Sequence, residues 1–213
     1  ANSFTDVVMS SRTYSQAMLL ARLAARWPGV PGVLPPLIAL TDPERTPDVA
    51  AFANSLPDGC ALIYRHFGRP ERFSEAARLA GIAREKRLVL LIAADPDLAD
   101  ACDADGVHWP ARLAGPARKW RRGRTGQIMT MSAHNRRELA LAAKAGADAA
   151  VLSPVFATRS HAGDTALGVH RARGLARACA IPVYALGGIT ADTAKHLSGS
   201  EFAGVAAIGG LKR

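Results

Sequence analysis

Eight short apolar runs recur along the chain and are separated by more polar segments. They are Leu37 to Leu40, Cys60 to Tyr64, Leu88 to Ala93, Gly106 to Trp109, Gln127 to Met131, Ala149 to Leu152, Pro182 to Leu186 and Gly204 to Ile208. Each run is continuously apolar rather than alternating, which is typical of strands buried on both faces of a parallel sheet. We therefore predict eight parallel strands at these positions.

Helical patterns occupy most of the segments between these strands. Arg69 to Lys86 spaces its apolar residues at helical intervals. Asn135 to Ala145 begins with a residue suited to capping and is followed by Gly146, a typical helix stop. Similar patterns run over Val169 to Ala178 and Ala191 to Leu197, whereas the segment between the fourth and fifth strands is weaker.

The alternation of strand and helix predicts an α/β fold, a (β/α)₈ TIM barrel with an extra N-terminal helix. An open doubly wound sheet is the alternative, although no GxGxxG follows the first strand to favour a dinucleotide-binding version. The extra helix is expected over Tyr14 to Trp27. Residues 1–36 are assigned to an N-terminal extension with this helix and a linker, and residues 37–213 to the barrel. The helix could close the bottom of the barrel or serve dimerisation, which leaves a homodimer open.

Composition limits the class of protein. The chain has 213 residues, of which 49% are hydrophobic, enough for one sizeable core. No apolar run approaches the roughly 20 residues of a membrane span. The start of the sequence lacks a basic region followed by an apolar one, so we expect a cytoplasmic protein with no membrane partner. Cys60, Cys102 and Cys179 have no CxxC spacing and are expected to be buried free thiols.

The net charge of +9 favours anionic partners such as phosphates or nucleic acid. The densest basic cluster, Arg118 to Arg124, is short, has one aromatic residue and lies in no zinc-finger or RNA-binding signature. It is interpreted as a solvated helix end, and nucleic acid is not expected as a partner.

Two glycine pairs follow the last two predicted strands, at Gly187-Gly188 and Gly209-Gly210. The active site of a TIM barrel lies at the C-terminal ends of its strands, and the loops after strands seven and eight commonly bind phosphate. Loops without Cβ atoms allow backbone amides to approach an anion closely. We therefore predict a phosphate site here, the alternative being a tight turn without a ligand.

The stretch VLSPVFATRSHAGD, residues 151–164, follows the sixth strand and adjoins this turn. Thr158, Ser160 and His161 can donate hydrogen bonds to an anion, and the glycine at 163 suggests a lid. An ordinary surface loop is the alternative. Arg65 ends the second strand on the polar rim, and His108 ends the fourth, either as a packed residue or as a ligand.

These pieces together resemble the thiamine phosphate synthase and thiazole tautomerase superfamily. LTD at 40–42, ADGVHW at 104–109, SAH at 132–134, GADAAVLSPVFATRSH at 146–161, and the turns VYALGGIT and GVAAIGG match its motifs in order and spacing. The resemblance implies a TIM barrel of thiamine biosynthesis that binds a small phosphorylated thiazole-type ligand. On the thiazole-phosphate side it implies Ser132, Gly187, Gly188 and Ile208. A hydroxyl that the family has near the eighth strand reads Gly209 here, and the backbone of Gly209 is still expected to help hold the phosphate.

The sequence departs from the synthases of that superfamily where they handle magnesium and diphosphate. The Asn-Asp after the third strand reads Ala-Ala at 93–94, the second metal aspartate reads Leu113, and two lysines read Phe67 and His161. Without these carboxylates a departing diphosphate is hard to neutralise, so we expect no metal site and no cofactor. Phe67, together with Trp109, also suggests a more apolar rim.

The surviving residues are those that a thiazole tautomerase would use, and such an enzyme moves a proton without metal. The resemblance implies that the histidine of its Ser-x-His motif, here His134, is catalytic, and imidazole exchanges protons readily near neutral pH. Ser132 and Thr158 would orient the ligand, and Arg65 or His161 would pair with its acidic group. Against this, His134 could simply belong to the start of the following helix.

Two other functions stay open. One is a thiamine phosphate synthase (thiamine-phosphate diphosphorylase) with a relocated metal site that uses Asp95 and Asp42, and magnesium belongs only to this alternative. The other is a non-catalytic ligand-binding or regulatory protein that keeps the barrel and the phosphate site.

Overall fold

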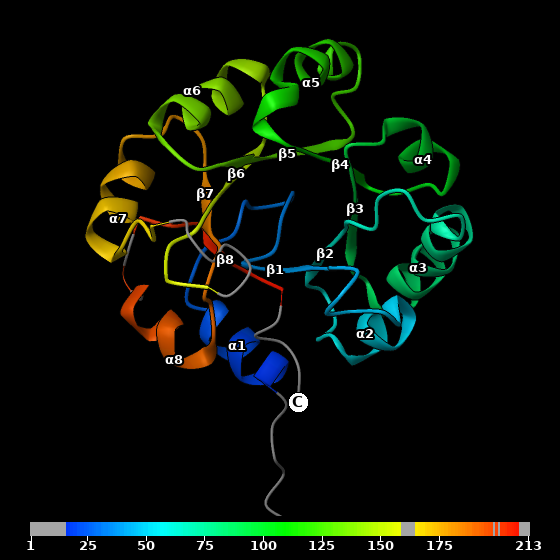
Figure 1. The fold of residues 1–213 in the computed structure, drawn as a ribbon, viewed down its shortest axis with the longest axis horizontal. Coiled ribbons are helices and arrows are strands. Elements are labelled where there is room, and N and C mark those ends of the chain that lie inside the picture. Colours follow the sequence, from blue (N-terminus) through cyan, green and yellow to red (C-terminus); the bar gives the residue numbers. More distant parts are fainter. Residues whose placement is uncertain (1–15, 159–164, 198, 200, 209–213) are drawn as a thin grey trace, which may run out of the picture.

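A closed barrel of parallel strands forms the centre of the computed structural model, which describes residues 16–158, 165–197, 199 and 201–208 (Figure 1). The strands pair in sequential order from β1 to β8, and β8 closes the ring on β1, with Leu37 beside Val205. Their bounds are β1 Leu37–Leu40, β2 Ala61–Tyr64, β3 Val89–Ala93, β4 Gly106–Trp109, β5 Ile128–Ala133, β6 Ala149–Leu152, β7 Val183–Ala185 and β8 Gly204–Ala207. The predicted TIM barrel is confirmed, and the open sheet is wrong.

Helices surround the strands in Figure 1. They are α1 Gln16–Ala24, α2 Val49–Ser55, α3 Arg72–Lys86, α4 Pro96–Ala101, α5 Ala114–Arg121, α6 Arg136–Ala145, α7 Val169–Arg177 and α8 Ala191–Ala194, with the 3₁₀ segments η1 Ala111–Leu113 and η3 Lys195–Leu197. The predicted caps are confirmed: the Asn135 side chain accepts from the Glu138 amide, and Gly146 ends α6 in the left-handed conformation. The weak segment between β4 and β5 is indeed helical.

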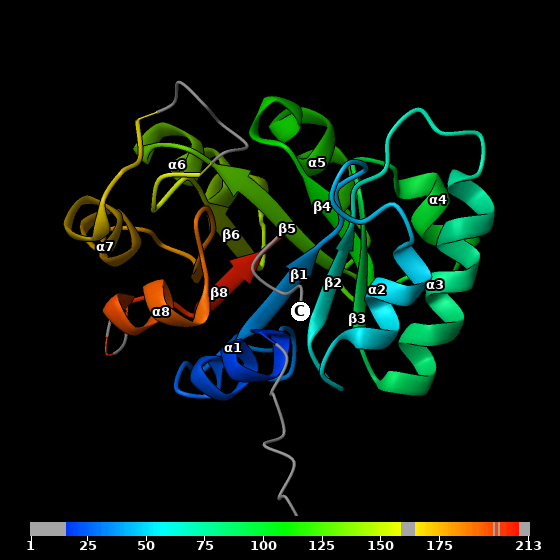
Figure 2. The same ribbon diagram turned by 60° about the horizontal axis from the view of Figure 1, so that its bottom comes forward.

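The segment before β1 closes the end of the barrel at which the strands begin (Figure 2). Leu34 is buried in the cluster of side chains inside the barrel. The Tyr184 hydroxyl, inside the barrel, donates to the carbonyl of Pro35 at 2.9 Å. Helix α1 buries Leu20 and lies beside α8 and β1. The extra helix therefore exists and the linker after it closes the bottom of the barrel, while the predicted start at Tyr14 lies outside the described residues.

Alternate strand residues face the inside of the barrel, and the others face the helices. Ile63, Leu91 and Val151 belong to the inner cluster, whereas their neighbours Leu62, Leu90 and Leu152 belong to the outer one. Because side chains alternate in direction along a strand, every second residue that continues an inward-facing position points into the mouth of the barrel.

Other expectations from composition can be compared with the described residues. In the basic cluster, Arg121 pairs with Asp148 at 2.6 Å and Arg124 pairs with Asp100 at 2.8 Å, which agrees with a helix end held by ion pairs. The three cysteines are free, but only Cys60 and Cys102 are buried, while Cys179 is half-buried, so the predicted burial is wrong for Cys179. Burial raises the pKa of the Cys60 thiol to about 12. Among these residues, no helix is both long enough and apolar enough to span a bilayer.

Candidate active site

A cavity of about 730 Å³ opens at the C-terminal ends of the strands. Its lining continues the inward-facing positions of the strands with polar side chains, since Arg65 lies two residues beyond Ile63, and Ser153 two beyond Val151. On β5 the same period places Ser132 and His134 in the lining. The cavity has the size and position of a small-molecule site in this fold.

The two halves of the ring contribute different chemistry. Elements that follow β1, β2 and β4 supply the arginines Arg45, Arg65 and Arg112. Elements from β5 to β8 supply hydroxyls, His134 and the Gly187-Gly188 turn. The described lining contains no Asp or Glu. A site of this composition attracts an anionic ligand.

His134 is held by its ring at the mouth of the barrel. Its Nδ1 lies 2.8 Å from the carbonyl oxygen of Ser153 and 3.4 Å from the Ser153 hydroxyl. Because a carbonyl only accepts, Nδ1 carries the proton, and Nε2 is the basic nitrogen of the neutral ring. The Asn135 side chain caps α6 by accepting a hydrogen bond from the Glu138 amide. His134 contributes to this helix start through its backbone amide, which donates to the Glu138 carboxylate at 2.8 Å. The ring is therefore not needed for the helix start.

The Gly187-Gly188 turn packs directly against the loop that follows β6. Gly187 and Gly188 have φ of 96° and 65°, and a Cβ at Gly188 would lie 2.7 Å from the Ala157 carbonyl oxygen. The amide of Phe156 donates to the Gly187 carbonyl at 3.0 Å, which joins the two loops. The glycines are thus required by the turn itself, and the turn also lines the cavity.

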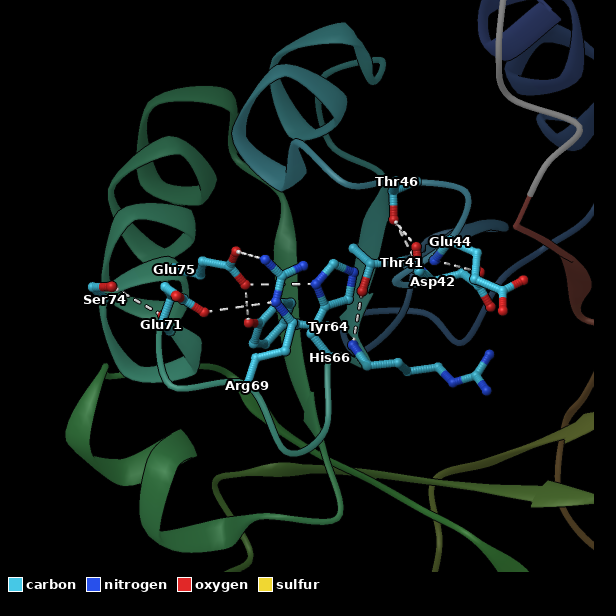
Figure 3. A network of polar contacts seen from close by, with 11 residues as sticks. Thr41, Asp42, Glu44, Thr46, Tyr64, His66, Arg69, Glu71, Ser74 and Glu75 are labelled. Atoms are coloured by element: carbon cyan, nitrogen blue, oxygen red, sulfur yellow. Dashed lines mark hydrogen bonds and ion pairs between the residues drawn. The ribbon is translucent and has the colours of Figure 1, made fainter.

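Arg65 extends from a firmly held strand end. Its backbone amide donates to the Thr41 hydroxyl at 2.8 Å. Behind it, the Glu75 carboxylate accepts from the Tyr64 hydroxyl and lies 3.5 Å from the buried His66 ring (Figure 3). Burial lowers the pKa of the Arg65 guanidinium, and the charge of Asp42 partly offsets this. These contacts anchor β2 from the helix side while Arg65 faces the cavity.

His108 lies in the cavity floor and is uncharged at neutral pH. Its Nδ1 lies 2.8 Å from the Thr130 hydroxyl. Burial, followed by the nearby charge of Arg65, lowers its pKa from 6.5 to about 3. The hydrogen bond to Thr130 agrees with the interpretation of His108 as a packed residue. His108 also belongs to the cavity lining, so its interpretation as a ligand-binding residue stays open.

The depressed pKa predicts a pH dependence of stability. Below pH 6.5 the unfolded chain protonates His108, whereas the folded ring stays neutral down to about pH 3. The neutral, buried His108 ring therefore does not reduce the free energy of unfolding above pH 6.5. Between pH 6.5 and about pH 3 it lowers that free energy by about 1.4 kcal/mol for each unit by which the pH falls. Urea unfolding at pH 7 and pH 5 should show a smaller drop for His108→Gln than for the wild type, and equal drops would contradict the assignment.

The described carboxylates near the cavity are already hydrogen-bonded or ion-paired within the protein. Asp95 accepts from the Leu98 amide at the start of α4 and pairs with Arg72, and the Asp42 carboxylate accepts from amides of its own loop. Ala94 has a φ of 53° and no donor side chain. Among the described residues no group of three His, Cys, Asp or Glu could hold a metal ion. The relocated site at Asp95 and Asp42 therefore stays a prediction, and in the structure both carboxylates already have protein partners.

The cavity brings together most of the candidate residues and adds others. Arg65, Ser132, His134, Thr158, Gly187, Gly188 and Ile208 all line it. Ser160, His161 and Gly209 lie outside the described residues. Trp109 is not on the rim, since it is buried on the helix side with its ring 5.9 Å from that of Trp120. Phe67 does line the cavity.

Several lining residues were missed by sequence reasoning, among them Ser153, Arg112 and Arg45. Ser153 could have been found from the period of two that starts at Val151. Arg112 lies in η1, next to Leu113. This segment was considered in the sequence only because Leu113 stands where the family has a metal-binding aspartate. Arg45 follows a turn in which the Asp42 carboxylate accepts from its amide at 3.2 Å, and no motif marks it.

The fold and the cavity define a (β/α)₈ barrel with a cavity lined by arginines and hydroxyls at the C-terminal ends of its strands. The profile described as thiamine monophosphate synthase matches residues 37–211. The chain belongs to this family.

Individual relatives agree with the family. A putative thiamine-phosphate synthase 2 of Aquifex aeolicus is 31% identical over 180 residues, which cover 82% of this chain and 96% of that protein. The thiamine-phosphate synthase of Chloroflexus aurantiacus is 30% identical over 68% of this chain and 67% of its own length. The structure of a thiamine phosphate pyrophosphorylase from Pyrococcus furiosus superposes with a TM-score of 0.69 at 28% identity, covering 81% of this chain and 84% of that one.

Proposed function

We propose that this barrel binds a phosphorylated thiazole-type ligand and isomerises it by moving a proton, without a metal ion. The observation that carries the proposal is the cavity lining, which combines three arginines with His134 and contains no carboxylate among the described residues. Membership of a thiamine-biosynthesis family supports a thiazole phosphate as the ligand. The position of the glycine turn, after β7, supports phosphate binding there.

In the proposed mechanism the backbone of the Gly187-Gly188 turn holds the phosphate, and Ser132 and Thr158 orient the ring. The hydrogen bond from Nδ1 of His134 to Ser153 selects the tautomer whose Nε2 accepts a proton. Nε2 would remove a proton from one carbon of the ligand ring and return it to another. The sum of the two steps is an isomerisation, so no second substrate is consumed. General acid–base catalysis of this kind contributes roughly 10²- to 10⁴-fold to a rate.

The second candidate is a thiamine-phosphate synthase. The printed names of the relatives favour it, since they are thiamine-phosphate synthases rather than tautomerases. Such an enzyme would have to stabilise the departing diphosphate, and in this chain the arginines of the cavity are the available groups. The missing carboxylates are the reason for placing this function second.

One experiment separates the candidates. The protein is incubated with a thiazole carboxylate phosphate in excess EDTA, and the ring isomers are followed by NMR. Our proposal predicts interconversion with the chelator present. A failure to convert the isomer, combined with heat stabilisation by the same ligand, would point instead to a binding protein.

A further inference from the structure

His108 is a buried histidine that the proposed mechanism does not use. It lies on β4 and lines the cavity, and its neighbours on the adjacent strands are Ala93 of β3 and Thr130 of β5. Because His108 is only 7% exposed, the polar atoms of its ring need partners inside the protein or on a ligand. The partners of its two ring nitrogens therefore indicate what this histidine can do.

The hydrogen bond between His108 and Thr130 selects one tautomer of the ring. Thr130 is fully buried, and the contact of its hydroxyl with Nδ1 of His108 at 2.8 Å is its only side-chain hydrogen bond within the described part of the chain. If Nδ1 donated to the hydroxyl oxygen, the hydroxyl proton would be buried without an acceptor, which is unfavourable. The hydroxyl therefore donates to Nδ1, and the ring proton lies on Nε2.

Nε2 of His108 is open to the cavity. A few side-chain nitrogens in the structure are buried and have no partner, and both ring nitrogens of His66 are among them. Nε2 of His108 is not one of these atoms, although it makes no hydrogen bond within residues 16–158, 165–197, 199 and 201–208. It is therefore accessible from the cavity that the ring lines, and the neighbouring Ala93 side chain carries no acceptor for its proton.

The two histidines of the cavity have opposite tautomers. Burial, followed by the charge of Arg65, lowers the pKa of His108 to about 3, so the ring is neutral and Nε2 has a proton to donate. In His134 the proton lies on Nδ1, which donates to the Ser153 carbonyl, and Nε2 is basic. Two titratable groups whose surroundings give them different states commonly divide the roles of base and electrophile.

We propose that His108 is a second catalytic residue, which donates a hydrogen bond from Nε2 to the ligand atom that gains negative charge when His134 removes a proton. The electron pair of the broken C–H bond is delocalised onto a nitrogen or oxygen of the ligand. No bond of His108 breaks, and His134 returns the proton to a second carbon. A donor fixed in advance at such an atom stabilises the transition state. The catalytic role rests on the proposed function, whereas the tautomer of His108 does not.

The first test is ¹⁵N NMR of the histidine rings at pH 7 without ligand, since the protonated and unprotonated nitrogens of a neutral imidazole have well-separated shifts. The signals of His108, identified by their absence in His108→Gln, should show the proton on Nε2. Thr130→Val should shift the Nδ1 signal because that nitrogen loses its donor, and Thr130→Ser is the matched control that keeps a hydroxyl. A wild-type ring protonated at Nδ1 would overturn the proposal.

The second test adds a thiazole carboxylate phosphate in EDTA to the same sample, with saturation established by calorimetry. The Nε2 signal of His108 should shift because its proton gains an acceptor. The ring signals of His196, which is exposed on η3, should stay in place. A His108 signal that does not move at saturation would also overturn the proposal.

The third test compares two substitutions in the isomerisation assay. His108→Leu removes the donor and should lower kcat by about 10²- to 10³-fold with little change in KM. His108→Gln can place an amide N–H close to the position of Nε2 and should retain more of the rate. A wild-type rate in His108→Leu would refute the catalytic role, and the NMR tests need only the wild type if this variant fails to fold. If the ligand shifts Nε2 but the wild type converts no isomer, the contact stands and the proposed function fails.

Discussion

Replacing His134 by glutamine is expected to slow isomerisation of the thiazole ligand by roughly 10²- to 10⁴-fold. The amide can keep a hydrogen bond to the Ser153 carbonyl, which accepts from Nδ1 of His134 at 2.8 Å, but it cannot take up a proton. Ligand affinity should change little, because in our proposal the backbone of the Gly187-Gly188 turn, rather than the His134 ring, holds the phosphate. Steady-state rates from the NMR assay, with Kd from calorimetry, measure the two effects separately.

His196→Gln is the matched control for this variant. His196 is exposed on η3 and does not line the cavity, so its replacement should leave the rate unchanged. If His134→Gln retained the wild-type rate, the assignment of His134 as the proton carrier would be wrong.

Gly188→Ala is expected to weaken binding of the thiazole phosphate by on the order of 10²-fold, since small displacements of positioning groups have effects of this size. The added Cβ would lie 2.7 Å from both the Ala157 carbonyl oxygen and the Phe156 Cβ, in a backbone with a φ of 65°. The loops after β6 and β7 must therefore separate, and the amides of the turn move with them. Calorimetry gives the affinity, and urea unfolding gives the accompanying loss of stability, about 1–3 kcal/mol.

Gly174→Ala provides the control for this substitution. Gly174 lies within α7, and a Cβ there would meet nothing within 4 Å. The change should leave ligand binding intact and raise the free energy of unfolding by about 0.5–1 kcal/mol. Full phosphate affinity in Gly188→Ala would show that the turn does not hold the ligand.

The barrel could be predicted from the sequence because its signal is local. Each strand is a continuous apolar run, and strands that are hidden on both faces have no polar positions to confuse the pattern. The end of β5 was placed too early, at Met131, whereas the strand extends to Ala133. Ser132 breaks the apolar run because it faces the cavity rather than the core.

The site was predictable only where a residue's position along a strand determined its direction. Arg65, Ser132 and His134 continue the inward period, and they do line the cavity. The direction of Asp95 was not predictable, because it depends on Arg72, a residue 23 positions away in sequence. Trp109 was misplaced for a related reason: its neighbour His108 faces inward, so Trp109 must face the helices.

Family membership favours the thiamine-phosphate synthase reaction, whereas the cavity lining favours the isomerisation that we propose. The named relatives are thiamine-phosphate synthases. In this chain the Asp95 carboxylate caps the start of α4, and the Asp42 carboxylate accepts a hydrogen bond from the Arg45 amide in its own loop. Arginines line the cavity on that side, and this lining is why we propose a reaction without Mg²⁺.

The most direct test of this account is incubation of the protein with a pyrimidine diphosphate and a thiazole phosphate, with Mg²⁺ and with EDTA, followed by quantification of thiamine phosphate. The account predicts no Mg²⁺-dependent product, while the isomerisation assay on the same preparation continues in EDTA. Thiamine phosphate formed only with Mg²⁺, at an ordinary enzymatic turnover of about 1 s⁻¹ or faster, would contradict it.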